Sequence, residues 1–87
     1  MRQIVALLAP INATQLLPDG AEEDTGPWGA IGVPTATLAT QNDKYFYFHH
    51  SQGDTMTVYT PEMLDLAAAL YAVTAFTAAD MPDLLPR

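Results

Sequence analysis

The long apolar run Leu66–Ala79 constrains this sequence more than any other feature. Every residue in the run is apolar or threonine. It follows a strong helix start, in which Thr60 can cap the exposed amides and Pro61 suits the first turn. Pro82 stops the pattern, so the sequence predicts a helix that ends at about Met81. A helix that is apolar on all sides is normally buried on all sides.

A chain of 87 residues has little material to cover such a helix. A domain of this size buries only about 60% of the surface that its unfolded chain exposes, which leaves its stability marginal. The sequence contains no cysteine, which excludes disulfides, thiol catalysis and thiolate zinc sites. We therefore expect the helix to pack on a larger sheet and against neighbours outside these residues.

The other elements are shorter. Met1–Leu8 has the pattern of a helix, which Pro10 ends. Ile11–Leu17 predicts a short strand before the turn signal at 18–20, and the β-branched and apolar segment Thr35–Thr40 predicts a buried strand. The order of helix, strand, short helix, strand, long loop and helix predicts an α/β fold, in which a mixed sheet is covered by helices.

An acidic triplet, Glu22–Asp24, precedes a predicted helical turn at Thr25–Trp28, which Gly32–Pro34 closes. Its carboxylates could be metal ligands. A solvated loop whose charges favour the positive end of a helix dipole is the commoner meaning of such a triplet, by about two to one.

The charge balance restricts the partners. Ten acidic residues stand against Arg2, Lys44 and Arg87, which gives a formal net charge of −7. Phosphate backbones and anionic membrane surfaces would repel such a chain, so no nucleic-acid partner is expected. The run Leu66–Ala79 is shorter than the roughly 20 residues of a membrane span, and residues 1–9 make a poor signal peptide. We expect no membrane span, and these features leave the compartment open.

The most site-like stretch is Tyr45–Phe48 followed by His49, His50, Ser51 and Asp54. Imidazole is the commonest protein ligand for zinc, and a nearby carboxylate can orient the ring through its other nitrogen. In an extended segment adjacent histidines point to opposite faces, so at most one of the two would meet a given metal and the other would face the core or a substrate.

Two other interpretations of this stretch are possible. A histidine pair beside aromatics is a packing feature more often than a ligand pair, by about two to one. Ser51 beside His50 suggests a hydrolase nucleophile, but adjacent residues rarely reach attack geometry and no Gly-x-Ser-x-Gly turn is present.

The segment Lys44–Val58 closely resembles the last metal-binding loop of the carboxypeptidase Q family, also called plasma glutamate carboxypeptidases. The segments 8–15, 24–28 with 32–34, and 79–87 also look like the carboxyl-terminal portion of that family, in register and without gaps. The resemblance thus extends over essentially the whole chain.

The resemblance implies a two-zinc exopeptidase that hydrolyses a dipeptide bond and is secreted or lysosomal. The histidine directly before Ser or Thr is a zinc ligand in that pattern, so the role falls on His50. Asp54 matches the acid that orients the loop or the imidazole, and Asp24 matches a supporting acid near the site. Where relatives tend to have glycine before this last acid, the chain has Glu22 and Glu23.

The family's other metal ligands, its catalytic glutamate and its signal peptide lie upstream of the matching region. We therefore expect residues 1–87 to be an incomplete carboxyl-terminal portion of a zinc peptidase domain, with no catalytic residue, no tight zinc binding and no activity alone. The alternative is a noncatalytic acidic module that docks onto another chain or forms a homodimer.

Overall fold

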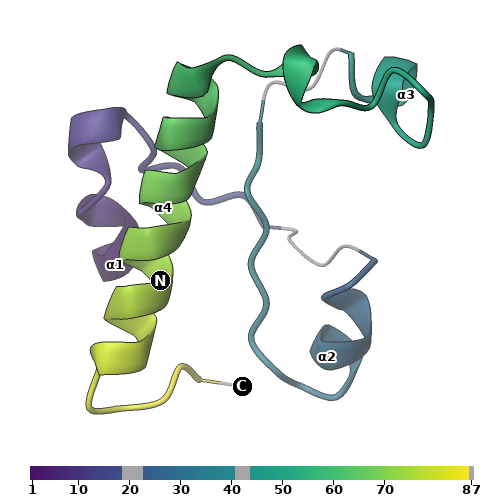
Figure 1. The fold of residues 1–87 in the computed structure, drawn as a ribbon. Coiled ribbons are helices and arrows are strands. Elements are labelled where there is room, and N and C mark those ends of the chain that lie inside the picture. The colour runs from purple at the N-terminus through teal and green to yellow at the C-terminus, as the bar shows by residue number, and fades with distance from the viewer. Residues whose placement is uncertain (19–22, 41–43, 87) are drawn as a thin grey trace.

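The computed structural model describes residues 1–18, 23–40 and 44–86, and all described elements are helical. Figure 1 shows the long α4 beside α1, with the short α2 and α3 held away from it by extended connections. In chain order the elements are α1 Arg2–Ala6, the 3-10 turn η1 Ala9–Ile11, α2 Gly26–Ala30, α3 Tyr45–Phe48, the 3-10 turn η2 Met56–Val58, and α4 Pro61–Asp80.

The predicted α/β fold is wrong, because no strand occurs in the parts of the chain that the structure describes. Ile11 belongs to η1, and Asn12 then turns the chain in a left-handed conformation with φ of 56°. The segment Thr35–Thr40 runs extended, and Figure 1 shows it as a single trace between α4 and α2. β-branched residues favour a pleated surface only when a neighbouring strand accepts the backbone hydrogen bonds. The turn signal at 18–20 lies partly outside the described residues.

The predicted ends of α4 are confirmed. The Met63 amide donates a hydrogen bond to Thr60 Oγ1 at 3.3 Å, and Pro61 occupies the first turn. Met81 leaves the helix in an extended conformation, directly before Pro82. The short helical turn after the acidic loop is also confirmed as α2, and the amino-terminal helix is confirmed as α1.

The start of α4 should respond to pH. The Glu62 backbone amide and then the Thr60 hydroxyl, by hydrogen bonding to the Glu62 carboxylate, hold its pKa below the ordinary 4.5. Because the folded-state pKa of Glu62 is lowered, its ionised carboxylate stabilises the helix above pH 4.5. This stabilisation is lost as the pH falls through the folded-state pKa. Circular dichroism should show helix loss on acidification, and Thr60→Ala should reduce the helix signal at neutral pH. An unchanged pH profile in Thr60→Ala would contradict this role.

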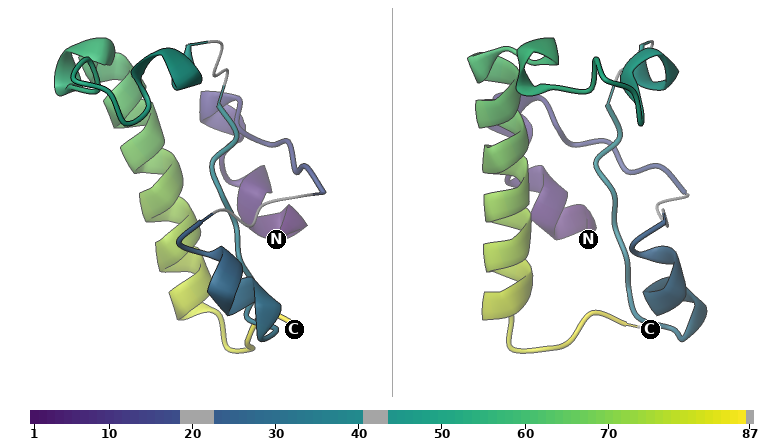
Figure 2. Two further views of the ribbon diagram at one scale, coloured as in Figure 1. Left: turned by 90° about the vertical axis from the view of Figure 1, so that its right-hand side faces the viewer. Right: turned by 45° about the vertical axis from the view of Figure 1, so that its right-hand side comes forward.

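The core of the described residues is very small. Ile4, Val5 and Leu8 are the buried apolar residues, and α1 packs against α4 (Figure 2). No residue of α4 is fully buried, although the helix is apolar on nearly every side. The burial predicted for α4 is therefore not provided by this chain.

The dimensions agree with this open arrangement. The radius of gyration is 14.6 Å, whereas a compact domain of this length has about 12 Å. The accessible surface is 7596 Å², whereas a folded monomer of this mass exposes about 5,000 Å². The chain thus exposes far more surface than a self-contained domain.

Among the described residues, α4 is long and apolar enough to cross a membrane by length and composition. The predicted absence of a span rested on the shorter run Leu66–Ala79, and the whole helix passes this test. Core helices of soluble proteins pass it as well, so the finding is weak evidence for a span.

Candidate functional site

The two histidines follow one turn of helix. Tyr45–Phe48 forms α3, and the Tyr45 ring stacks on the His49 ring with centroids 4.4 Å apart. Tyr45 Oη lies 3.5 Å from His49 Nε2. Residues four apart are neighbours on a helix surface, which explains this pairing. His49 is half-buried as a result.

The argument that the histidines point to opposite faces fails, because this segment is not extended. After α3 ends, His50 takes a left-handed conformation with φ of 55°. The imidazoles of His49 and His50 then lie with centroids 4.0 Å apart. Histidine tolerates this region better than most residues, and such outliers gather at functional sites. The turn places both rings on one side.

The loop after His50 is held by Ser51. Its hydroxyl donates to the Phe48 carbonyl at 2.7 Å and accepts from the Gly53 amide at 3.1 Å. A Cβ at Gly53 would lie 3.3 Å from Phe48 Cδ1, so glycine permits the close approach. The Ser51 hydroxyl therefore has a structural role, which agrees with its rejection as a nucleophile.

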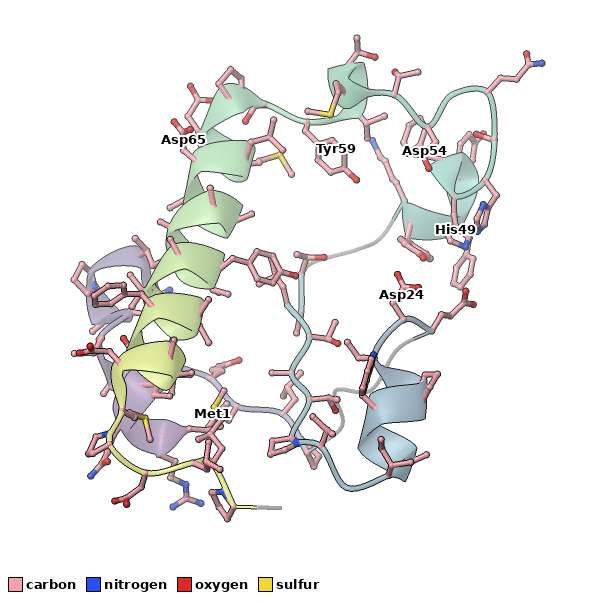
Figure 3. All side chains as sticks on the ribbon, turned by 60° about the horizontal axis from the view of Figure 1, so that its bottom comes forward. Met1, Asp24, His49, Asp54, Tyr59 and Asp65 are labelled. Atoms are coloured by element: carbon pink, nitrogen blue, oxygen red, sulfur yellow. The ribbon has the colours of Figure 1, made fainter. Side chains whose placement is uncertain are left out.

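An open cavity of about 710 Å³ joins this turn to distant parts of the chain. His49 and His50 line it together with Glu23 and Asp24, and Tyr71 of α4 forms part of its wall. Figure 3 shows Asp24 on the segment before α2, at the side of that segment that faces His49. Two histidines and two acidic residues from segments far apart in sequence thus line one open space.

The predicted site residues fall in different places. His50 is exposed and lines the cavity, and so does Asp24. Asp54 is not part of the lining; its amide donates to the Ser51 carbonyl at 3.1 Å, and no hydrogen bond joins its carboxylate to either imidazole. Figure 3 shows Asp54 and Asp24 on either side of His49. Glu22 lies outside the described residues.

Sequence reasoning missed that His49 and Glu23 share the cavity with His50. The spacing of four between Tyr45 and His49 was an available signal for a helical turn. The proximity of Glu23 had no local signal, because it depends on how distant segments pack.

The donors in the cavity are of the kind that zinc binds, namely imidazole nitrogen and carboxylate oxygen. However, no three histidine, aspartate or glutamate side chains of the described residues lie close enough to hold a metal ion. A zinc site needs three or four protein ligands, so the described part of this chain does not fit a complete one.

Comparison with known proteins gives one consistent result. The chain is 47% identical over 87 residues to carboxypeptidase Q of Homo sapiens and of Pongo abelii, and 46% identical to that of Mus musculus. The whole chain aligns with carboxypeptidase Q. The alignments cover 100% of this chain and 18% of each relative. The resemblance inferred from the residues is thereby confirmed.

The chain thus spans less than a fifth of the carboxypeptidase Q relatives that it matches. No family model and no solved structure matches the chain. The likeness to carboxypeptidase Q therefore rests on the sequence alignments.

Proposed function

We propose that this chain forms part of a zinc-dependent exopeptidase site of the carboxypeptidase Q type and contributes His50 as one metal ligand. The remaining ligands and the catalytic carboxylate come from polypeptide outside these 87 residues. The substrate is a small peptide, for which a dipeptide is the simplest case. The chain alone is inactive.

The observation that supports this proposal most is the position of His50. His50 is exposed and lines an open cavity that Asp24 and Glu23 also line. An imidazole enclosed by hydrocarbon could not meet a metal ion. An exposed His50 can meet an ion whose other ligands come from another segment. The cavity is broad and open, as expected for half of a site that a second surface completes.

The same geometry accounts for the predicted inactivity. A single histidine with loosely placed carboxylates neither holds zinc tightly nor fixes its coordination. A water molecule without a firmly bound metal keeps its ordinary high pKa. Peptide hydrolysis by the isolated chain is therefore not expected.

The proposal can be tested in a chimera. Human carboxypeptidase Q is prepared with its 87 aligned residues replaced by this chain, and dipeptide hydrolysis is measured for the chimera and for the isolated chain. We expect turnover from the chimera alone. A folded but inactive chimera, or robust turnover by the isolated chain, would contradict the proposal.

A second candidate function is a noncatalytic docking module. The exposure of α4 favours it, because an apolar helix without burial needs a covering surface. This candidate and the peptidase proposal are compatible if the covering surface belongs to the rest of the peptidase.

A further inference from the structure

His49 lies at the centre of a small cluster of rings. Its imidazole stacks on the Tyr45 ring, with centroids 4.4 Å apart and ring planes inclined by 27°. Phe46 and His50 both meet it edge to face, with centroids at 6.2 Å and 4.0 Å. Aromatic pairs prefer such arrangements, because the electron-rich face of one ring attracts the positive edge of another. Three neighbouring rings thus hold the His49 imidazole.

His50 has far fewer contacts. Its backbone is left-handed with φ of 55°, and its side chain is exposed. Within the described residues, His49 is its one ring partner, and no hydrogen bond reaches its ring nitrogens. In this part of the chain, the direction of the His50 ring therefore depends on His49 more than on any other side chain.

A histidine that binds a metal needs support of this kind. One ring nitrogen must point at the ion, and a carboxylate or carbonyl that accepts a hydrogen bond from the other nitrogen usually fixes the ring. Asp54 is the acid expected in this role, and no hydrogen bond joins its carboxylate to either imidazole. A ring packed against the imidazole also restricts its rotation, and this contact occupies neither nitrogen.

Two other roles for His49 fit the contacts less well. A metal ligand needs a ring nitrogen that faces open space, but Tyr45 Oη lies 3.5 Å from His49 Nε2. A group that contacts substrate is expected to be exposed on the cavity surface, whereas His49 is half-buried among the rings around it. The contacts favour a role that His49 exerts through its neighbour.

We infer that His49 is a positioning residue: held by Tyr45, it packs against the His50 imidazole and fixes the direction in which that ring meets a metal ion. This inference rests on the proposed function, because it takes His50 as the metal ligand. It gives His49 no contact with metal or substrate. What His49 supplies is a flat ring, so another flat ring at this position should serve.

Zinc affinity of the chimera with human carboxypeptidase Q tests the inference. His49→Ala should weaken zinc binding about tenfold and lower kcat similarly with KM unchanged, because loss of groups that orient metal ligands costs about 10- to 100-fold. His49→Phe keeps a flat ring and should restore most of both values. The control Tyr47→Ala removes an exposed ring of the same turn, whose ring partner is Phe48, and should change neither value. Competition with a chelator gives the zinc affinity per folded chain.

Three outcomes in the chimera would overturn the inference. If His49→Phe is as deficient as His49→Ala, the imidazole nitrogens matter and not the ring. An unchanged zinc affinity per folded chain in His49→Ala would reduce the residue to a packing role. A raised KM with unchanged kcat would indicate substrate contact. His50→Gly separates these failures from failure of the proposed function, because full zinc binding and activity in that variant would refute the ligand role itself.

The contact between Tyr45 and His49 can be measured on the chain alone, without zinc. Protons that lie over the face of an aromatic ring have nuclear magnetic resonance signals shifted upfield. The His49 ring protons should therefore move downfield in Tyr45→Ala and stay in place in Tyr45→Phe, which keeps the stacked ring. Identical His49 signals in Tyr45→Ala and the unmodified chain at the same pH would overturn the inference.

Discussion

Replacing His50 by alanine in the chimera with human carboxypeptidase Q is expected to reduce dipeptide hydrolysis by at least about 100-fold. Loss of groups that merely orient metal ligands costs about 10- to 100-fold in metal affinity or activity, so loss of a ligand should cost at least as much. The fold should tolerate the change, because the His50 side chain is exposed and fills no core position. Steady-state kinetics on the purified chimeras gives the comparison.

Three further variants make this result specific to His50. His50→Gly removes the imidazole and suits the left-handed backbone at φ of 55°, so it should lose activity with a fully folded chain. Gln52→Ala changes an exposed neighbour and should have no effect. His49→Ala should cost less than His50→Ala. Equal activity in His50→Gly and the unmodified chimera would refute the ligand role.

Replacing Ile4 by alanine is expected to unfold most of the isolated chain. Ile4 is 2% exposed and is one of three buried apolar residues in the described parts of the chain. Truncating a buried Ile to Ala costs about 2–5 kcal/mol. Small domains have a total stability of about 0.05–0.15 kcal/mol per residue, so this loss is a large share of what a chain with so small a core can have. Circular dichroism during urea unfolding measures the effect.

The matched control for this change is Leu7→Ala. Leu7 follows the same helix but is 57% exposed, so its truncation should alter the unfolding free energy by less than about 0.5 kcal/mol. Similar losses from both substitutions would show that α1 does not pack against α4 in solution. In the chimera, Ile4→Ala should be less damaging, because additional packing raises the total stability.

The sequence was sufficient for elements whose signals are local. The start of α4 is set by Thr60 and Pro61 and its end by Pro82, and these signals act within a few residues. The strands predicted at 11–17 and 35–40 depend on hydrogen bonds to other strands, which local pattern cannot supply. The burial of α4 against neighbours outside these residues stays a prediction, because none of the described residues of this chain covers the helix fully.

The candidate site also has one part that a local sequence motif indicated and one part that depends on distant segments. The choice of His50 came from a motif that resembles carboxypeptidase Q, and the structure leaves its role as a ligand a prediction. The shared cavity with Asp24 and Glu23 arises from long-range packing, so no local pattern indicated it. Asp54 as an orienting acid also stays a prediction, and no hydrogen bond joins its carboxylate to either imidazole.

The zinc content of the chimera tests the central claim most directly. Zinc per chain is measured by mass spectrometry after dialysis, for the unmodified chimera and for His50→Gly at matched folded fraction. We expect the unmodified chimera to retain two zinc ions and the variant to retain fewer. Equal zinc content in the two proteins would contradict the claim that His50 is a metal ligand.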